Sequence, residues 1–473
     1  MKGMKKNVAL LLAVVLVGFA ALGGYFFYAV TAYGTRWFST PYNTRLQRAK
    51  SQVYAGSIYD RNAHLLVRTA EDGSREYPVS ETAKAAMAQL IGDVNGAVPT
   101  GAESMFANYL LGFQSSLAER FSQLFSGQRV GDSIQLTVDI ELQKYAYQLF
   151  PEGKRGGAVL YNYRTGEIYC LYSTPGIDLD DPTAGLDEED DGLLLNRITQ
   201  GRYAPGSVFK IVTLACALEY LPDVMNRSFH CEGSLQVTEE VALTDTDGEG
   251  HGDLTFGEAF AKSCNIAFGQ LALELGQERL AKTARAMGFD GNFLFSDLIV
   301  YESLFPDSIA DEGELAWTGV GQGKLMVNPM HMALIVGSVA NDGQMVEPQL
   351  LLGVVDSQLR VTNKLSTKVY TRTMSASVAK TIQELMIQVV ESGTGGAAAV
   401  EGYTIGGKTG TAQVNSSGGA YQPHSWYVGF CADEEAPFAV CVVVENGGSG
   451  SGSAARLAGD LMERAIERLA GDA

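Results

Sequence analysis

An almost unbroken apolar segment near the N-terminus constrains this chain more than any other feature of its sequence. The segment from Val8 to Val30 contains no charged side chain, and three lysines, at positions 2, 5 and 6, lie just before it. A helix of this length crosses the apolar core of a bilayer, which takes about 20 residues. Basic residues ahead of such a helix favour a cytoplasmic N-terminus. We therefore expect a cytoplasmic segment at residues 1–7, a single-pass membrane anchor at 8–30, and the rest of the chain outside the cytoplasm.

A cleaved signal peptide is the alternative interpretation, because Ala20, Ala21 and Ala29 provide the small side chains of a cleavage site. The apolar stretch of a signal peptide normally has only about 7–15 residues, however. The length of this segment therefore favours an uncleaved anchor in the cell membrane.

The composition describes a large, acidic protein. The chain has 473 residues, of which 46% are hydrophobic, enough for roughly two or three domains. The net charge is −19, although every charged residue before Asp60 is basic. The acidic excess outside the membrane argues against nucleic acid as a partner. The basic stretch from Arg36 to Lys50 is suited to anionic lipid head groups.

A serine and a lysine three residues apart, in Ser207-Val-Phe-Lys210, form the first candidate catalytic motif. The preceding residues 202–206 include Pro205 and Gly206, which predict a turn, and the apolar spacing after Ser207 predicts a helix. Ser207 would then sit at the positive end of the helix dipole, with Lys210 on the same side one turn later. A desolvated lysine near other cations can act as a base. We predict Ser207 as nucleophile and Lys210 as its base.

The same spacing occurs a second time, in Ser377-Val-Ala-Lys380. No turn residues precede this copy, and it lies within a stretch rich in serine and alanine. We interpret it as two residues on one face of an ordinary helix.

The second motif is Ser263-Cys-Asn265, set among apolar residues. The Ser263 hydroxyl can relay a proton between lysine and a leaving amine, and the Asn265 amide can hold a substrate peptide group. The alternative is structural, with Ser263 and Asn265 capping the start of a helix.

The third motif is Lys408-Thr-Gly-Thr411, predicted to lie on a strand. Gly410 would let a substrate backbone approach the strand edge. The Lys408 charge and the hydroxyl of Thr409 suit a substrate carboxylate. The backbone N–H of Thr411, together with that of Ser207, could form an oxyanion hole.

A phosphate-binding loop is the alternative for this segment, because Gly402 to Thr409 satisfies G-x-x-x-x-G-K-T. That loop requires a following helix, whereas the residues after Thr409 continue as a strand. A site outside the cytoplasm also has little access to ATP. The phosphate-binding interpretation is therefore rejected.

The cysteines and histidines predict no metal site and no cofactor. The six cysteines are Cys170, Cys216, Cys231, Cys264, Cys431 and Cys441, and no two form a C-x-x-C pair. A disulfide between Cys431 and Cys441, on the two arms of a predicted hairpin, is left open. The five histidines lack ligand spacing, and no G-x-S-x-G motif accompanies them.

The segment from 31 to 140 is predicted to form a small linker or pedestal domain. Its sequence combines short strand-like pieces with helical periodicity over Glu81–Ile91 and Ser104–Phe125. We expect the catalytic domain to occupy residues 141–473.

The catalytic domain is predicted to be α+β. A hairpin is expected from residues 157–161 and 168–172 at its beginning, and a helix from 454–469 at its end. Three more strands are expected at 403–414, 425–432 and 438–445. One sheet would thus be built from the first and last parts of the domain, with helices between them in sequence.

In this order, the three motifs resemble those of the class B penicillin-binding proteins, which are monofunctional peptidoglycan D,D-transpeptidases. The resemblance covers most of the chain. It includes Gly56–Asn62, Arg164–Ile168, Ser173–Pro175, Gly319–Gly323, Glu391–Thr394 and Trp426–Phe430. It implies an antiparallel sheet flanked by helices, an all-helical subdomain, a transmembrane helix and a small pedestal.

The resemblance also implies a reaction. Ser207 would be acylated by the penultimate D-Ala of a stem peptide, and an amine from a neighbouring stem would then attack, while penicillins and other β-lactams would trap the acyl-enzyme. Lys210 would be the base, Ser263 the relay and Asn265 a substrate orienter. Lys408, Thr409, Gly410 and Thr411 would line the carboxylate and oxyanion contacts.

Other functions share these motifs. A D,D-carboxypeptidase uses water as the acceptor, and a β-lactamase or β-lactam sensor keeps the same serine and lysine. A non-catalytic wall-synthesis scaffold would have lost motif residues that are all present here. The resemblance further implies a separate glycan polymerase of the SEDS type as partner.

Overall fold

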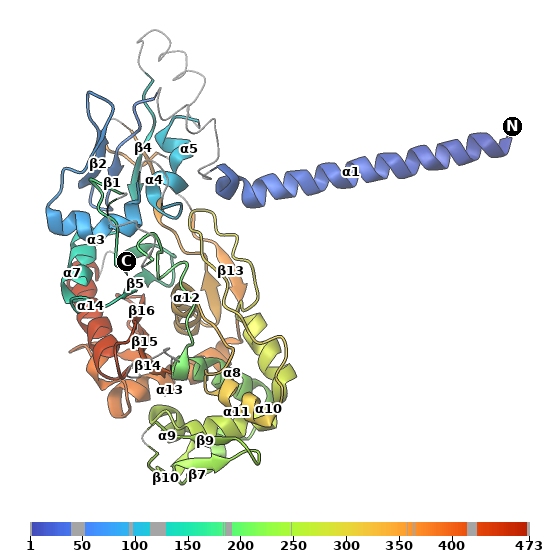
Figure 1. Cartoon of the computed structure of the whole chain (residues 1–473), viewed down its shortest axis with the longest axis vertical. Coiled ribbons are helices and arrows are strands. Elements are labelled where there is room, and N and C mark those ends of the chain that lie inside the picture. Colours follow the sequence, from blue (N-terminus) through green and yellow to red (C-terminus); the bar gives the residue numbers. More distant parts are fainter. Residues whose placement is uncertain are drawn as a thin grey trace.

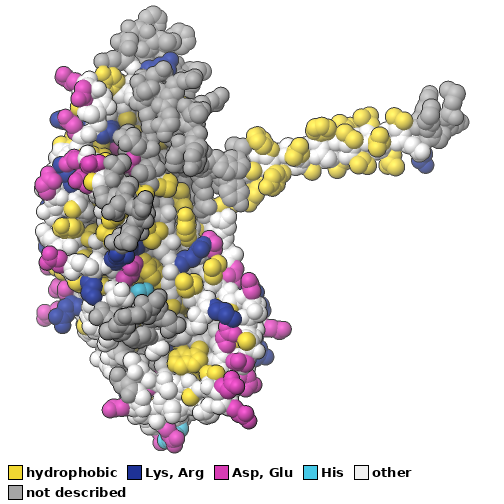
Figure 2. Space-filling view, in the orientation of Figure 1, with side chains coloured by type: hydrophobic (Ala, Val, Ile, Leu, Met, Phe, Trp, Pro, Cys, Tyr) yellow, Lys and Arg dark blue, Asp and Glu magenta, His cyan; other side chains and the backbone are white. Residues whose placement is uncertain are grey.

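A computed structural model of the chain describes residues 2–38, 53–93, 98–113, 129–182, 184, 192–246, 248–356, 358–362, 364, 366–413 and 423–470. The long helix α1 (Lys2–Phe38) projects away from a body of mixed helices and strands (Figure 1). Within α1, the segment Lys6–Ala29 has a mean hydropathy of 2.4. Its apolar side chains are exposed along the shaft (Figure 2). Among the described residues it is the one helix long and apolar enough to cross a membrane.

A five-stranded sheet forms the part of the body nearest α1 in Figure 1. Its strand order is β12-β4-β1-β2-β3, with β4 (Ser133–Leu136) parallel to β1 (Ile58–Tyr59) and antiparallel to β12 (Leu351–Val355). The remaining members are β2 (Leu65–Thr69) and β3 (Arg75–Glu76). Strand β12 comes from the middle of the catalytic segment, more than two hundred residues after β4. This sheet is therefore completed by a strand from outside residues 31–140, the segment predicted to form a pedestal.

The helices beside this sheet follow the sequence expectation in part. Helix α3 (Glu81–Ile91) has the predicted bounds, and the Ser80 side chain caps it. The helix expected from residue 104 is shorter and interrupted, as α4 (Ala102–Met105) and α5 (Ala107–Leu110). The rest of that expected helix, beyond residue 113, lies outside the described residues.

The central sheet has the order β14-β15-β16-β5-β6, with all neighbours antiparallel. This confirms the prediction that the first and last parts of the domain share one sheet. The strands are β5 (Gly156–Asn162), β6 (Ile168–Thr174), β14 (Ile405–Ala412), β15 (His424–Cys431) and β16 (Phe438–Val444).

Helices cover both faces of the central sheet, so almost all residues of its strands are buried. On β16, alternate residues pack into two separate clusters of apolar side chains. One cluster includes helix α12 (Pro329–Ala340), and the other includes helix α14 (Ser453–Leu469). A strand buried on both faces needs a continuous apolar run, which is what FAVCVVV in β16 provides.

The register of the last two strands excludes the disulfide that was left open. Cys441 faces Val428 across the ladder, whereas Cys431 lies three residues farther along β15. That offset amounts to about 10 Å. The two side chains also belong to the clusters on opposite faces of the sheet. All six cysteines are free and buried.

The subdomain at the lower end of Figure 1 carries the middle of the sequence. Its helices are accompanied by two small two-stranded sheets, β7–β10 and β8–β9, so it is helical with two β-ribbons and not purely helical. Its elements are β7 (Ser228–Cys231), β8 (Ser234–Gln236), β9 (Ala242–Thr244), β10 (Gly252–Thr255), α9 (Phe256–Ala261), α10 (Asn265–Ala286) and α11 (Glu312–Gly319).

The remaining described elements are helices and one further two-stranded sheet, formed by β11 and β13. They are α7 (Ile140–Leu149), η1 (Gly206–Phe209), α8 (Lys210–Tyr220), η2 (Val224–Asn226), β11 (Gln344–Val346), β13 (Val369–Arg372), α13 (Ala376–Ser392) and η3 (Gly396–Ala398). Helix α8 packs against α10 and α13, so the segment carrying Ser207 sits between the subdomain and the central sheet.

Glycine at position 206 allows the turn before α8 to lie against strand β14. Its φ is +57°, and its N–H donates to the carbonyl of Gly321 at 2.8 Å. A Cβ atom at this position would lie 2.5 Å from the carbonyl oxygen of Thr411. The backbone on both sides is therefore in direct contact, and the turn has no room for a side chain.

We expect Gly206→Ala to lower the melting temperature of the full-length protein more than Gly402→Ala does. Gly402 has a φ of +82°, and a Cβ atom there would have nothing within 4 Å, so alanine meets only the left-handed backbone penalty of about 1–2 kcal/mol. At Gly206 the steric clash between the new Cβ atom and the Thr411 carbonyl oxygen adds to this backbone penalty. Equal shifts for the two variants, measured by thermal unfolding in detergent, would contradict the close packing.

Candidate active site

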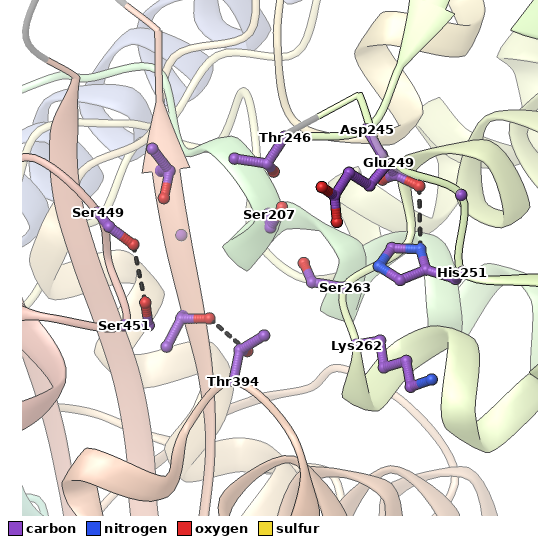
Figure 3. Close-up of a pocket in the computed structure, with 14 residues that line it drawn as sticks. Ser207, Asp245, Thr246, Glu249, His251, Lys262, Ser263, Thr394, Ser449 and Ser451 are labelled. Atoms are coloured by element: carbon purple, nitrogen blue, oxygen red, sulfur yellow. Dashed lines mark hydrogen bonds and ion pairs between the residues drawn. The ribbon is translucent and has the colours of Figure 1, made fainter. Parts of the chain in front are cut away.

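The three sequence motifs meet at one cleft of about 300 Å³ between the central sheet and the helical subdomain. In Figure 3, Ser207 and Ser263 lie between strand β14 and the loop that carries Asp245, Glu249 and His251. The lining residues are Ser207, Asp245, Thr246, Glu249, Gly250, His251, Lys262, Ser263, Thr394, Thr409, Gly410, Thr411, Ser449 and Ser451.

Ser207 opens the helical segment as predicted. It is the second residue of the 3₁₀ helix η1, which runs directly into α8 at Lys210. Pro205 precedes this start, and the fixed φ of proline favours such a first turn. The serine is half-buried and lines the cleft. Its position gives an incoming group access to the hydroxyl.

Lys210 is fully buried, and its ammonium is held by the second motif. Its Nζ donates to the Ser263 carbonyl at 2.5 Å, to Asn265 Oδ1 at 2.7 Å and to Ser263 Oγ at 3.3 Å. Burial lowers the pKa of Lys210 to about 8, although the charges of Asp245 and Cys264 oppose the shift. The neutral amine is therefore accessible near physiological pH.

Ser263 bridges two lysines. Its Oγ accepts from Lys408 Nζ at 2.8 Å as well as from Lys210 Nζ. A hydroxyl has two acceptor lone pairs and one proton. With both lone pairs engaged, its proton is free to be donated into the cleft. The φ of Ser263 is +60°, in the left-handed region. The turn between α9 and α10 therefore places this side chain between the two lysines with a strained backbone.

Lys408 lies behind the cleft wall and not in it. It is fully buried on β14, and its Nζ reaches Ser263 instead of the cleft surface. Burial, followed by the charge of Lys210, lowers the pKa of Lys408 well below its usual range. The sequence suggested that this ammonium would contact a substrate carboxylate directly, whereas the structure surrounds it with protein.

The neighbouring residues of β14 form the cleft wall. The hydroxyl of Thr409 is 2.6 Å from that of Thr394, and Thr411 Oγ1 accepts from the N–H of Gly450 at 3.1 Å. A Cβ atom at Gly410 would lie 2.8 Å from the carbonyl oxygen of Pro205. Gly410 thus lets the turn before Ser207 approach the strand, a structural need that sequence reasoning assigned only to the substrate.

Both polar atoms of the Asn265 side-chain amide form hydrogen bonds within the protein. Oδ1 accepts from Lys210, and Nδ2 donates to the carbonyl of Thr244 at 2.8 Å. Its backbone N–H donates to Asp245 Oδ1 at 2.6 Å. It is also the first residue of α10, so the capping interpretation is partly right: Cys264, not Ser263, is the N-cap and accepts from the N–H of Ala267.

Several cleft residues were missed in the sequence. Thr394 belongs to a segment that carried the family resemblance, so that signal was present. His251, Glu249 and Lys262 gave no signal, because they become neighbours only when the loop after β9 folds over the start of α10. His251 Nδ1 lies 3.2 Å from Asp245 Oδ2.

The second serine–lysine pair is a surface feature. Ser377 and Lys380 are exposed on helix α13, whose N-cap is Ser375. This confirms the interpretation of the pair as two residues on an ordinary helix.

Comparisons with known proteins agree on the family. Residues 156–463 match the model of the penicillin binding protein transpeptidase domain. The peptidoglycan D,D-transpeptidase PbpA of Mycolicibacterium smegmatis is 29% identical over 348 residues, covering 70% of this chain and 70% of that protein. The structure of the ceftriaxone acyl-enzyme complex of penicillin-binding protein A from M. tuberculosis superposes with a TM-score of 0.77 at 25% identity, covering 89% of this chain and 99% of that one. The crystal structure of the D,D-transpeptidase domain of a peptidoglycan glycosyltransferase from Eggerthella lenta superposes with a TM-score of 0.73 at 28% identity. This match covers 88% of this chain and 99% of that one.

We expect Ser263→Gly to melt at a higher temperature than Ser263→Ala. Both variants remove the hydroxyl between the two lysines, but glycine accepts a φ of +60° without the penalty of about 1 kcal/mol that alanine meets. Thermal unfolding of the two full-length variants, side by side with the parent protein, measures the difference. A glycine variant that melts below the alanine variant would argue against backbone strain at this position.

Proposed function

This chain belongs to the class B penicillin-binding proteins, and from this we propose that it is a serine D,D-transpeptidase that cross-links peptidoglycan stem peptides through Ser207. One observation carries the assignment of the residues. Ser207 and Ser263 line a single cleft whose wall is β14, and two buried lysines with lowered pKa values meet at the Ser263 hydroxyl behind it.

In the first half-reaction, Ser207 Oγ attacks the carbonyl carbon of the penultimate D-Ala. The Oγ–C bond forms, the peptide C–N bond breaks, and the terminal D-Ala leaves as an amine that needs a proton. Lys210 takes the serine proton, because a pKa of about 8 leaves about a tenth of it neutral at pH 7. The Ser263 hydroxyl, in contact with Lys210, passes its proton to the leaving amine and takes the proton held by Lys210 in exchange, so that Lys210 is neutral again.

Lys408 acts in this scheme through Ser263. Its hydrogen bond to Ser263 Oγ favours the hydroxyl with its proton directed into the cleft. The substrate carboxylate would be met by the hydroxyls of Thr409 and Thr411 on the cleft wall.

Strand β14 is an edge strand of the central sheet, so a stem peptide can pair with it in an extended conformation. Its carbonyl oxygen at the reacting carbon would then lie near the start of helix η1. We assign the backbone N–H groups of Ser207 and Thr411 to the oxyanion formed there. In the second half-reaction an amine from a neighbouring stem attacks the acyl carbon. The new C–N bond forms, the Ser207 Oγ–C bond breaks, and the proton lost by the amine returns to Ser207 Oγ through Ser263 and Lys210.

The membrane arrangement is also proposed. Helix α1 would be a single-pass anchor at residues 8–30, with residues 1–7 in the cytoplasm and the cleft outside it. A pedestal at 31–140 would hold the transpeptidase domain, 141–473, above the membrane. A glycan polymerase of the SEDS type in the same membrane would supply the strands to be cross-linked.

We expect Ser207→Ala to abolish covalent labelling of the full-length protein by fluorescent penicillin, because the acylated oxygen is removed. Ser377→Ala, which changes the exposed serine of the second serine–lysine pair, is the matched control and should label like the parent. In-gel fluorescence measures both, and thermal unfolding shows that the variants are folded. Retained labelling in Ser207→Ala would reject this serine as the nucleophile.

The rate of acylation should rise with pH up to about 8 and then level off. Lys210 has to be neutral to accept the serine proton, and burial sets its pKa at about 8. Below that value the neutral fraction falls about tenfold per pH unit. The measurement is the second-order rate constant of penicillin labelling between pH 6 and 9.5. A rate that is constant from pH 6 to 8 would exclude Lys210 as the titrating base.

A further inference from the structure

The two walls of the cleft on either side of Ser207 differ in chemistry. The wall formed by β14 and the segments beside it presents hydroxyl groups, those of Thr394, Thr409, Thr411, Ser449 and Ser451. The opposite wall is formed by the end of α9 and by the β9–β10 loop, whose described residues are 245–246 and 248–251. Of the described lining residues, all that carry a titratable acid or base lie on this second wall, and they are Asp245, Glu249, His251 and Lys262.

Glu249 is the charged group of this wall that faces the reacting serine. Its side chain is exposed, and Figure 3 shows its carboxylate directed toward Ser207 and the Ser263 hydroxyl. No residue in the described part of the chain donates a hydrogen bond to this carboxylate or forms an ion pair with it. Asp245, by contrast, is engaged by the Asn265 N–H, and the ammonium of Lys262 is directed away from Ser207 in Figure 3.

The backbone that carries Glu249 is held in place by close packing. A Cβ atom at Gly233 would lie 2.3 Å from the carbonyl oxygen of Gly248, and the Gly233 carbonyl accepts from the N–H of Asp245 at 2.9 Å. The loop is also tied to the second motif, because Asp245 Oδ1 accepts from the Asn265 N–H at 2.6 Å. The position of Glu249 relative to the active site is therefore set by the fold, and its side chain is left to meet a ligand.

A transpeptidase brings two substrates of opposite charge to one serine. The donor stem ends in a carboxylate, which suits the hydroxyl wall. The acceptor stem brings a primary amine, which is mostly protonated near neutral pH, since the pKa of such a group is about 10. A carboxylate and an ammonium form a charge-assisted hydrogen bond. Because a donor paired with β14 occupies the hydroxyl wall, the acceptor has to approach from the wall that carries Glu249.

We propose that Glu249 binds the ammonium group of the acceptor stem, so that the acyl-enzyme is attacked by a cationic amine in preference to water. This inference rests on the proposed transpeptidase function and assigns a second substrate subsite within the same cleft. The acceptor class that it selects is a primary amine on a flexible side chain or bridge, whose positive charge reaches the β9–β10 loop.

The protons in this step balance without a permanent transfer to Glu249. The bound ammonium first releases one proton to solvent, to which Glu249 is exposed. The lone pair of the neutral amine then forms the C–N bond, and the electron pair of the broken C–O bond stays on Ser207 Oγ. The second amine proton reaches Ser207 Oγ through Ser263 and Lys210, as in the scheme above.

A different role for the same side chain is to orient a water molecule, which would favour hydrolysis over transfer. The two roles separate in Glu249→Gln, because glutamine keeps an oxygen that can accept a hydrogen bond but removes the negative charge. Loss of the charge weakens the binding of an ammonium. Loss of a base for water would instead slow hydrolysis.

The test gives the full-length protein in detergent uncross-linked glycan strands with pentapeptide stems, which serve as donor and acceptor. Mass spectrometry after muramidase digestion counts cross-linked dimers, from transfer, and free tetrapeptides, from hydrolysis. Both products come from the same acyl-enzyme, so their ratio is independent of the acylation rate. We expect Glu249→Gln to lower the dimer-to-tetrapeptide ratio about fivefold, the upper range for an exposed ion pair, and Glu249→Lys to lower it further.

The matched control is Glu240→Gln. Glu240 is an exposed glutamate between β8 and β9 that does not line the cleft, and its variant should give the ratio of the parent protein. Added salt provides a second readout, because it screens exposed charges. The ratio of the parent should fall toward that of Glu249→Gln as the salt concentration rises to about 1 M, while the ratio of Glu249→Gln should change little.

The outcomes separate this inference from the proposed function. An unchanged ratio in Glu249→Gln, or a ratio that rises because hydrolysis slows, would overturn the acceptor subsite while leaving the transpeptidase intact. A parent protein that labels with penicillin but forms only tetrapeptides would instead reject the transpeptidase assignment and the subsite with it. Equal losses in Glu249→Gln and Glu240→Gln would show a general effect of surface charge and would also overturn the subsite.

Discussion

One hydroxyl group, that of Ser263, holds two buried lysines, and the architecture of the cleft depends on it. Lys210 comes from the first turn of α8, Lys408 from strand β14, and Ser263 from the turn before α10. Burial disfavours the charged form of both ammonium groups, and at Lys408 the nearby charge of Lys210 adds to this effect. Both lysines therefore have lowered pKa values. The packing that joins the three segments at Ser263 also buries Lys210, the proposed base for the serine.

Close backbone packing makes this contact possible. Gly206 and Gly410 let the turn before Ser207 lie against β14, where a side chain at either position would meet a carbonyl oxygen within 3 Å. The central sheet in turn is fixed from both faces by α12 and α14. Ser207, the proposed nucleophile, thus stands on well-packed elements, which suits a reaction that depends on the placement of a few atoms.

The side of the cleft opposite β14 is built differently, from loops and short β-ribbons. Asp245 connects these loops to α10 through the Asn265 N–H, and its other oxygen faces Cys231, Cys264 and His251. The backbone of the Ser263–Asn265 motif is thus tied to these loops by a hydrogen bond.

Local patterns in the chain were enough to predict the membrane-spanning length of the first helix and the strands of the central sheet. They also predicted the helix start at Ser207 and the order of the three motifs. Each of these features depends on periodicity, turn residues or short spacing. Only the folded chain shows that Lys408 points toward Ser263 and that β12 completes the sheet formed by β1–β4. It also shows that Cys431 and Cys441 lie on opposite faces of the central sheet. Cys231 and Cys264 share a cluster with Asp245 and His251, which the sequence did not indicate. These facts depend on contacts between segments far apart in the chain. Such contacts are set by how whole elements pack, and no local pattern of residues records them.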